Sequence, residues 1–406
     1  MPMKTMIEFW DEDPMNNVYG VVVCRPDRVL YLAAPGQIPT RQSESLPRFF
    51  AGMGIRVEIA RREISRGDLA GMLHVLEEIL AEEADCCFDL TGGAELAMAA
   101  LGQLSAERPV PMIQFDPNDG KLVLKRNCTW EPAAEARFAC KDIVNLMGGL
   151  LLDSHGHFDG RDMSRELRED SMRVWSVYRK HYKEWSTQTF YLQKMTPVGR
   201  DPLLVEGLRI VNRDNYNMVA CNETILRELA DVGILSELAI QEKQVRFRYK
   251  NARLKGMLSI AGLWLEIYCY LAAKESGVFQ DAQISALINW EGKTFKSEAE
   301  TVYNEIDVLL VRGATPVFIS CKSGSVNASS LYEISVLARE LGGGNARKVL
   351  ATTMPVRRNA PNVANRARQM GVELVEVQDM SLEELGRKLE ELSRPERKRE
   401  TGRQNV

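Results

Sequence analysis

The first 125 residues alternate short apolar segments with longer segments whose apolar side chains recur at helical spacing. The strand-like segments are residues 5–10, 28–33, 55–59, 86–90, 110–115 and 122–124, and the helical ones are residues 46–53, 68–83 and 95–104. Residues 18–24 fit either state, because a short β-branched run occurs both in strands and in buried helices. Strands separated by helices predict an α/β domain with a largely parallel sheet, helices on both faces and right-handed crossovers.

The chain has 406 residues, which is too long for one typical core and predicts two or three domains. No stretch of 18 apolar residues is uninterrupted, which argues against a transmembrane helix, and no apolar signal-peptide run follows the N-terminus. The eight cysteines form no CxxC pair, which argues against a zinc site and a disulfide framework. We therefore expect a cytoplasmic protein with no membrane partner. The net charge of -4 does not exclude nucleic-acid binding, because a local basic channel is enough.

The rest of the chain divides by composition. Residues 129–250 are rich in Arg, Lys, Glu and aromatic side chains, and predict a helical or winged-helix-like connector after a first domain of residues 1–128. Within it, residues 245–249 alternate apolar and basic side chains, which is typical of an edge strand. Residues 251–393 predict a third unit, with an apolar helix at 258–273 and strands at 305–311 and 317–322. Residues 394–406 have nothing apolar to bury except Val406, so we expect a disordered tail.

The two strands of the third unit carry a candidate catalytic site. Alternation places Ile306, Val308 and Leu310 on one face of the first strand and Glu305 and Asp307 on the other, while Ser320 and Lys322 share a face of the second strand. A tight turn between the strands would bring Asp307 close to Lys322. Glu266 is a charge inside the preceding apolar helix and is a natural second acid.

These residue types suit hydrolysis of a phosphodiester. Asp307 and Glu266 would hold Mg²⁺ or Mn²⁺ through hard oxygen atoms, and Lys322 would orient the attacking water or stabilise the developing charge. The backbone carbonyl of Cys321 is a further candidate metal ligand, and Glu333 on the following helix could line the site. The plainer alternative is that these are charges of an edge strand in ordinary surface ion pairs.

The order of helix Glu266, strand Asp307 and strand Lys322 resembles the PD-(D/E)xK nuclease superfamily, which implies a restriction-endonuclease-like α/β domain. That pattern has a second acid two residues before the lysine, where this chain has Ser320. The resemblance therefore implies catalytic roles for Glu266, Asp307, Ser320 and Lys322, and a serine in place of one metal-binding carboxylate.

A second candidate site lies in the first domain. Asp89-Leu90-Thr91-Gly92-Gly93 closes a strand and opens a helix, so the glycines allow close approach and the helix N-terminus offers free N–H groups to phosphate. The turn of residues 11–17 follows the first strand and should lie at the same carboxyl edge, where open α/β sheets bind ligands. A turn that needs its glycines only for backbone conformation, with no ligand, explains Thr-Gly-Gly about equally well.

Pro14-x-Asn16 after the first strand, with Leu-Thr-Gly-Gly after the fourth, is similar to the CRISPR-associated Rossmann fold (CARF) domain. With the nuclease motif, the chain resembles the CARF–nuclease effectors of type III CRISPR systems. The resemblance implies a homodimer that binds a cyclic oligoadenylate and then cleaves single-stranded RNA or DNA with Mn²⁺ or Mg²⁺. The implied ligand-binding residues are Asn16, Thr91, Gly92, Gly93 and Ala94. Glu95 stands where the family often has a lysine.

Two other functions stay open at this point. One is a ligand-responsive transcription regulator, with residues 129–250 as a winged helix and a nuclease core that has lost activity through changes such as Ser320. The other is a constitutive DNA nuclease of the restriction or repair type, whose first domain only dimerises.

Overall fold

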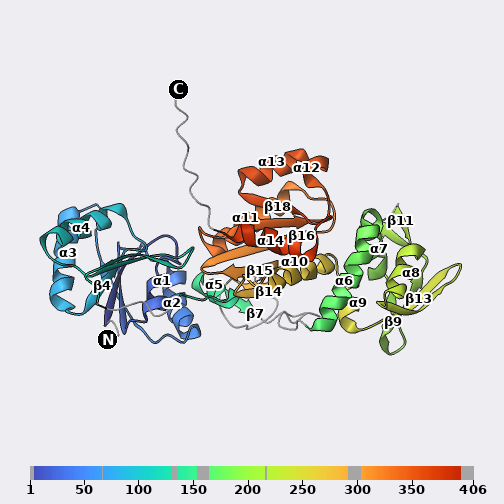
Figure 1. The fold of residues 1–406 in the computed structure, drawn as a ribbon, viewed down its shortest axis with the longest axis horizontal. Coiled ribbons are helices and arrows are strands. Elements are labelled where there is room, and N and C mark those ends of the chain that lie inside the picture. Colours follow the sequence, from blue (N-terminus) through green and yellow to red (C-terminus); the bar gives the residue numbers. More distant parts are fainter. Residues whose placement is uncertain are drawn as a thin grey trace, which may run out of the picture.

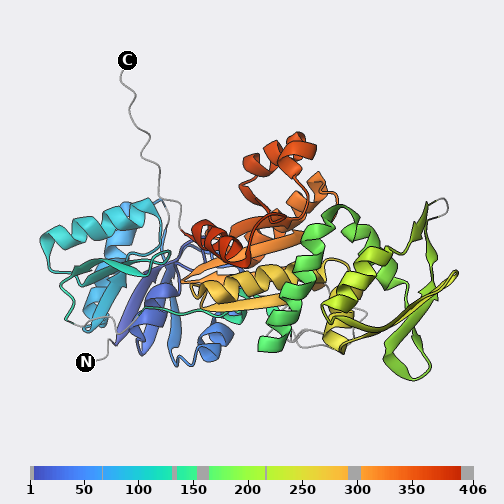
Figure 2. The ribbon, with the colours of Figure 1, turned by 45° about the vertical axis from the view of Figure 1, so that its right-hand side comes forward.

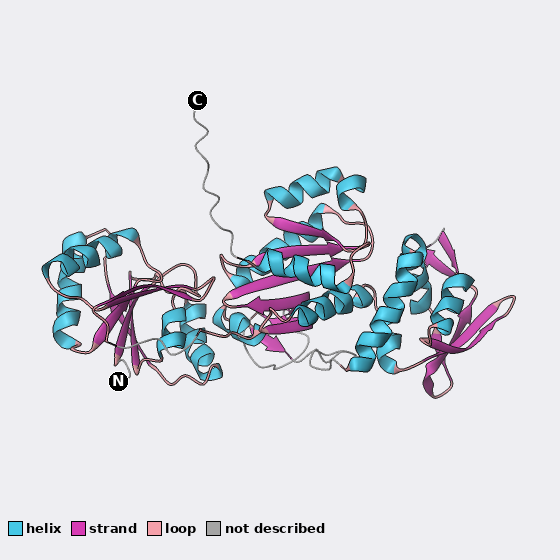
Figure 3. Ribbon diagram, viewed as in Figure 1, coloured by secondary structure: helices cyan, strands magenta, loops and turns pink. Residues whose placement is uncertain are grey.

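A computed structural model describes residues 4–65, 67–129, 135–152, 164–214, 217–290 and 303–394 of the chain. It contains three units, and the C-terminal unit lies between the N-terminal unit and the middle unit in both views (Figures 1 and 2). Each unit has its own sheet, which Figure 3 shows by secondary structure.

The N-terminal unit is a three-layer α/β domain. Its sheet has the order β3-β2-β1-β4-β5-β6, in which only β6 is antiparallel to its neighbour. The strands are β1 (Thr5–Phe9), β2 (Arg28–Ala33), β3 (Glu58–Glu63), β4 (Cys86–Asp89), β5 (Met112–Asp116) and β6 (Lys121–Arg126), and the helices are α1 (Tyr19–Cys24), α2 (Thr40–Gly52), α3 (Leu69–Glu82) and α4 (Glu95–Glu107). Helices α1 and α2 share an apolar cluster with one face of the sheet, and α3 and α4 share one with the other face. The predicted parallel α/β domain is confirmed.

The ambiguous segment of residues 18–24 is helix α1 rather than a strand. Val21 is fully buried and Val22 and Val23 nearly so, because the short helix packs between the sheet and the shared core. Tertiary burial therefore outweighs the β preference of this valine run. The strand predicted at residues 55–59 is β3, which begins three residues later, and the helix predicted at residues 46–53 already begins at Thr40.

The middle unit joins helices to a small antiparallel sheet of order β12-β13-β9-β8. Its elements are α6 (Arg165–Lys180), α7 (Tyr182–Gln193), β8 (Thr196–Val198), β9 (Asp201–Leu208), β10 (Ile210–Asp214), β11 (Asn217–Ala220), α8 (Glu223–Asp231), β12 (Leu235–Ile240), β13 (Gln244–Tyr249) and α9 (Ala252–Ser259). Strands β10 and β11 form a separate hairpin. The predicted edge strand is wrong: β13 lies between β12 and β9, and its alternation reflects one buried face with Val245, Phe247 and Tyr249.

The C-terminal unit has a six-stranded sheet of order β18-β17-β16-β15-β14-β7. Its elements are α5 (Cys140–Leu146), β7 (Leu150–Leu152), α10 (Leu263–Ser276), β14 (Asp281–Asn289), β15 (Tyr303–Arg312), β16 (Thr315–Lys322), α11 (Ala328–Gly342), β17 (Arg347–Thr352), α12 (Val356–Asn359), α13 (Pro361–Gln369), β18 (Val372–Glu376) and α14 (Leu382–Ser393). Helices α10 and α14 cover one face, and α5, α11 and α13 cover the other.

Three sequence expectations for this unit need comment. Strand β7 pairs with β14, so part of the expected connector of residues 129–250 completes this sheet. The apolar helix predicted at residues 258–273 is two helices, because Gly262 has a φ of 83° and the chain turns by 112° between α9 and α10. The tail of residues 394–406, which we predicted to be disordered, lies outside the described residues from position 395 onward.

The N-terminal and C-terminal units share one apolar cluster, which contains Phe49 and Phe138 as well as Phe318. A polar contact also joins them, because the Asn345 side-chain amide donates a 3.2 Å hydrogen bond to the Asp13 carboxylate. Among the described residues, no single helix is long and apolar enough to span a membrane; the bent pair of α9 and α10 passes that test only by length and composition.

Candidate functional site

The candidate catalytic site lies where strands β15 and β16 separate. Their ladder ends at the pair Val308–Ile319, so Asp307 and Ser320 lie just beyond it. The Asp307 carboxylate accepts a 2.6 Å hydrogen bond from the Cys321 backbone N–H and a longer one, 3.4 Å, from the Ser320 hydroxyl. The carboxylate thus takes a backbone donor of the neighbouring strand, which fixes it at the end of the hairpin.

The faces of β15 change at Asp307, which the sequence did not predict. Ile306 packs in the cluster beneath α11, whereas Val308 and Leu310 pack in the cluster beneath α10. The expectation that these three share a face is therefore wrong. In β14, Ser285 lies between the partners of Val308 and Ile306 and has a φ of 47°, a left-handed conformation that interrupts regular pleating at this point.

Glu266 reaches the same place from helix α10. Its side chain is only 8% exposed, and the Ser285 hydroxyl donates a 3.2 Å hydrogen bond to it. Burial, followed by the negative charges of Asp307 and Glu305, raises the pKa of Glu266 to about 8. Hydrogen bonding from Ser285 and the charge of Lys322 act in the opposite direction.

Asp307 experiences the same surroundings. Burial raises the pKa of its carboxyl, and Glu305 adds to this, while the Cys321 N–H and the Lys322 charge oppose it. Three acids and one lysine therefore interact electrostatically at one strand end, which is the juxtaposition that the sequence motif required. A buried acid pair with raised pKa values is a typical feature of a functional site.

A pocket between the strands and α11 is lined by Glu305, Asp307, Ser320, Lys322 and Glu333, together with the apolar side chains of Ile306, Phe318, Ile319, Ile334 and Leu337. Glu333, proposed from sequence only as a weaker candidate, does line it. Glu266 does not line this pocket and approaches from the α10 side of the sheet. The Cys321 thiol lies on that side too, 3.8 Å from the Cys269 sulfur, and burial raises its pKa well above the usual range.

The carboxylates of Glu266 and Asp307 fit a hard divalent cation, but they do not supply a complete set of protein ligands. Within the described ranges, no cluster of three or more His, Cys, Asp or Glu side chains has metal-binding geometry. Glu266 and Asp307 nevertheless repel each other as anions, and a cation between them would relieve both the repulsion and the desolvation that raise their pKa values. Mg²⁺ usually keeps several waters and takes one or two carboxylates, so two acids are sufficient.

Residue Ser285 was missed by the sequence analysis. Its hydroxyl holds Glu266, and its backbone conformation breaks the ladder opposite Asp307. No sequence signal marks it, because a serine within an alternating strand is common and its left-handed conformation depends on the surrounding sheet.

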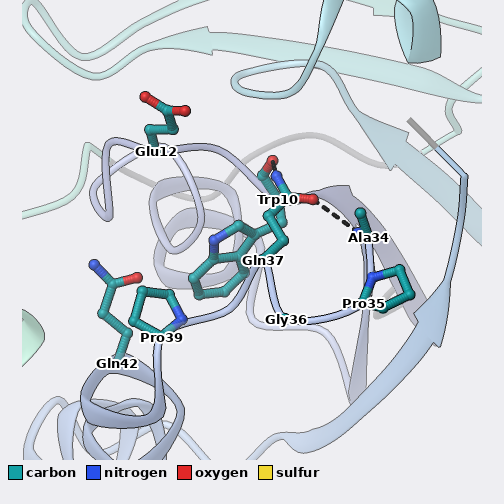
Figure 4. A pocket seen from close by; sticks show the side chains of 8 residues that line it. All are labelled: Trp10, Glu12, Ala34, Pro35, Gly36, Gln37, Pro39 and Gln42. Carbon is teal, nitrogen blue, oxygen red and sulfur yellow. Dashed lines mark hydrogen bonds between the residues drawn. The ribbon is translucent and has the colours of Figure 1, made fainter. Parts of the chain in front are cut away.

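A second hollow lies at the carboxyl edge of the N-terminal sheet. Two adjoining pockets there share Trp10, Glu12 and Gln37. The first is completed by Ala34, Pro35, Gly36, Pro39 and Gln42, as Figure 4 shows, and the second by Asp11, Gly93, Ala94, Glu95 and Leu96. These residues follow β1, β2 and β4, which places the hollow at the edge where the sequence predicted a ligand.

The five predicted ligand-binding residues divide into two groups. Gly93 and Ala94 line the second pocket. Thr91, Gly92 and Asn16 instead hold the loops together: the Thr91 hydroxyl donates to Asp89 and accepts a 3.0 Å hydrogen bond from the Phe115 N–H, and the Asn16 amide donates 3.2 Å to Asp11. A methyl group on Gly92 would lie 2.7 Å from the Asp11 Cβ, so this glycine permits loop packing.

The Asp11 carboxylate binds a backbone N–H at the start of α4, where the sequence predicted that a phosphate would bind. Its carboxylate accepts a 2.8 Å hydrogen bond from the Gly93 N–H at the start of α4, and another of 2.8 Å from the Asp13 N–H. The charged side chains lining the two pockets are Asp11, Glu12 and Glu95, all acidic. Trp10 and Gln37 were not predicted, although their position directly after β1 and β2 could have indicated them.

The architecture fits a CARF-like α/β domain at the N-terminus and a restriction-endonuclease-like α/β domain at the C-terminus. Residues 255–395 match the family model of the Card1-like endonuclease domain. The matched residues cover most of the C-terminal unit, including Glu266, Asp307 and Lys322. No curated protein matches the sequence.

Solved structures agree with this fold over nearly the whole chain. Can2 from Sulfobacillus thermosulfidooxidans, in complex with cyclic tetra-adenylate, has a TM-score of 0.67 at 14% identity, covering 97% of this chain and 98% of its own. Protein VC1899 from Vibrio cholerae has a TM-score of 0.69 at 17% identity, covering 96% of this chain and 97% of its own. At these identities the likeness establishes the fold.

Proposed function

We propose that this chain is a cytoplasmic, metal-dependent endonuclease that cyclic oligoadenylate activates to cleave single-stranded RNA or DNA in CRISPR antiviral defence. The observation that carries the proposal is the meeting of Glu266, Asp307 and Lys322 at one strand end, inside the domain that matches a Card1-like endonuclease.

Each residue of the site has a role in this proposal. Glu266 and Asp307 would hold Mn²⁺ or Mg²⁺, with the Cys321 carbonyl as a further ligand and the Ser320 hydroxyl in place of the usual acid. The metal would polarise the phosphate and lower the pKa of a bound water. Lys322 would position that water or stabilise charge on the phosphate in the transition state. Because Glu266 has a pKa of about 8, it must lose its proton before it can act as a ligand.

The hollow in the N-terminal unit is the proposed activator site. Gly93 and Ala94 line it, together with Trp10 and Gln37. A C₂ dimer of the chain would place two such hollows symmetrically, which suits a two-fold symmetric ring. The fold of Can2, whose structure contains cyclic tetra-adenylate, supports this part of the proposal.

The test is cleavage of labelled single-stranded RNA and DNA in Mn²⁺, with no nucleotide, with cyclic tetra-adenylate and with cyclic hexa-adenylate, each repeated in EDTA. Cleavage that requires both metal and one cyclic nucleotide is the expected result. Cleavage without any nucleotide would overturn the sensor role and favour a constitutive nuclease. Absence of cleavage in every condition, together with sequence-specific duplex binding, would favour the transcription regulator instead.

A further inference from the structure

Helix α7 of the middle unit adjoins the end of β16, where Lys322 is located. The Ser186 hydroxyl on α7 donates a 2.7 Å hydrogen bond to the backbone carbonyl of Ser323, the residue after Lys322. In Figure 1, α7 lies between the central sheet and the outer strands of the middle unit. One face of α7 therefore begins at the border of the candidate catalytic site.

Ser186 belongs to a stripe of side chains along α7. Residues three, four and seven apart share a face of a helix, so this stripe consists of Lys183, Ser186, Thr187, Phe190 and Lys194. Lys183, Thr187 and Lys194 are exposed, and Phe190 is half-buried. At a rise of 1.5 Å per residue, the stripe runs about 12 Å from Ser186 to Lys194.

Two cations meet at the far end of this stripe. The Lys194 ammonium lies 5.1 Å and the Arg213 guanidinium 5.3 Å from the centre of the Phe190 ring. Arg213 comes from β10, whose hairpin partner β11 packs against α7. No carboxylate of the described part of the chain forms an ion pair with Lys194 or Arg213 in this structure. The ring therefore holds two like charges close together without neutralising them, which leaves both available to an anion.

Apolar side chains are exposed on the strands of the same unit. Leu208, Ile210 and Met218, on β9, β10 and β11, are 60%, 50% and 64% exposed. Cations and exposed apolar side chains within one unit fit a ligand that has both phosphates and apolar rings. A single strand presents both at once, whereas the bases of a duplex are stacked inside it.

We propose that the α7 stripe and Arg213 form an extended contact surface that holds single-stranded nucleic acid as it leaves the catalytic pocket. Lys183 at one end of the surface, and Lys194 with Arg213 at the other, would contact phosphates, and the exposed apolar side chains would contact bases. This inference rests on the proposed nuclease function, because it assigns the surface to the strand that the pocket cleaves. It places part of the substrate affinity in the middle unit rather than in the nuclease domain.

The test compares two double variants of the full-length chain with equal loss of charge. Lys194→Gln with Arg213→Gln alters the surface, and Arg56→Gln with Arg108→Gln removes two exposed cations of the N-terminal unit as the control. Binding of a labelled 30-nucleotide RNA and DNA is measured in EDTA by fluorescence anisotropy at several salt concentrations. Cleavage of the 30-mer and of a tetranucleotide is measured in Mn²⁺ with the cyclic nucleotide.

The surface variant should bind the 30-mer about tenfold more weakly, while the control stays within about twofold. The slope of log K against log salt should become shallower by about 1.4, since each phosphate contact on a single strand contributes about 0.7. Cleavage of the tetranucleotide, which reaches only the pocket, should be unchanged.

Equal binding by the two double variants would overturn the inference even if the wild-type protein is an active nuclease. Tighter binding of a 30-base-pair duplex than of the single strand would overturn the substrate class assigned to the surface. The two proposals can also fail separately. If the wild-type protein cleaves nothing, the proposed nuclease function fails. If the surface variant alone then binds the single strand more weakly, the binding surface remains.

Discussion

The backbone N–H of Cys321 donates a 2.6 Å hydrogen bond to the carboxylate of Asp307, across the end of the β15–β16 hairpin. This bond replaces the ladder pairing that ends at Val308 and Ile319. It holds the carboxylate where the charge of Lys322 lowers its pKa and where its own charge raises the pKa of Glu266. The site is therefore held by backbone geometry as well as by side chains.

Lys322→Ala should lower the rate of cleavage by about 10²–10³, because it removes a positive charge that would act in the transition state. Affinity for the cyclic nucleotide should stay unchanged, since Lys322 lies in the C-terminal unit. Single-turnover cleavage and calorimetric nucleotide binding measure the two effects separately. Cleavage at the wild-type rate would remove Lys322 from the catalytic assignment.

The cleavage rate should rise with pH up to about 8 at subsaturating Mg²⁺, because Glu266 must lose its proton to bind the metal. Higher Mg²⁺ should move this rise to lower pH, since metal and proton compete for the same carboxylate. Rates from pH 6 to 9 at two Mg²⁺ concentrations provide the measurement. A profile that does not move with Mg²⁺ would show that another group titrates.

Glu266→Gln should change stability in the metal-free protein with a defined sign. The folded-state pKa of about 8 is above the ordinary value of 4.5, so the wild-type protein loses stability as pH rises between these values. The slope is roughly 1.4 kcal/mol per pH unit for one such group. The variant should therefore melt at a higher temperature than the wild type at pH 8.5 in EDTA, and at a similar one near pH 4.5. If the melting temperatures of the two proteins changed with pH in the same way, the raised pKa of Glu266 would be contradicted.

Ser320→Asp should lower the Mn²⁺ concentration that gives half-maximal cleavage, by about tenfold, because it supplies a carboxylate beside Asp307. In EDTA the same change should lower the melting temperature, since two acids would then face each other without a cation. Ser320→Ala is the control for loss of the hydroxyl. An unchanged metal requirement in the aspartate variant would mean that position 320 does not face the metal.

Gly93→Ala should weaken binding of the cyclic nucleotide and destabilise the N-terminal unit by about 1–3 kcal/mol. Its φ is 119°, and a methyl group there would lie 2.5 Å from the Phe9 Cβ. Gly102→Ala, within the helix α4 that follows, is the matched control, because nothing lies within 4 Å of its added methyl group, and it should stabilise by about 0.5–1 kcal/mol. Melting curves with and without nucleotide distinguish the two variants; equal behaviour would contradict the strained turn.

The sequence by itself determined the order of most elements and the placing of Asp307 within electrostatic reach of Lys322. Both follow from local rules: alternation along a strand, helical spacing and a short turn that sets two strands side by side. The same rules located the loop of Gly93 and Ala94 at the edge of the first sheet.

Only the tertiary structure decided which side chains are free to act. Thr91 and Asn16 look like ligand-binding groups in the sequence, yet their hydrogen bonds to Asp89 and Asp11 make them part of the loop framework. Ser285 looks unremarkable, yet its left-handed backbone and its bond to Glu266 shape the catalytic end of the sheet. Local patterns specify backbone state, whereas the partners of a polar group depend on contacts between residues far apart in the chain, which one sequence does not contain.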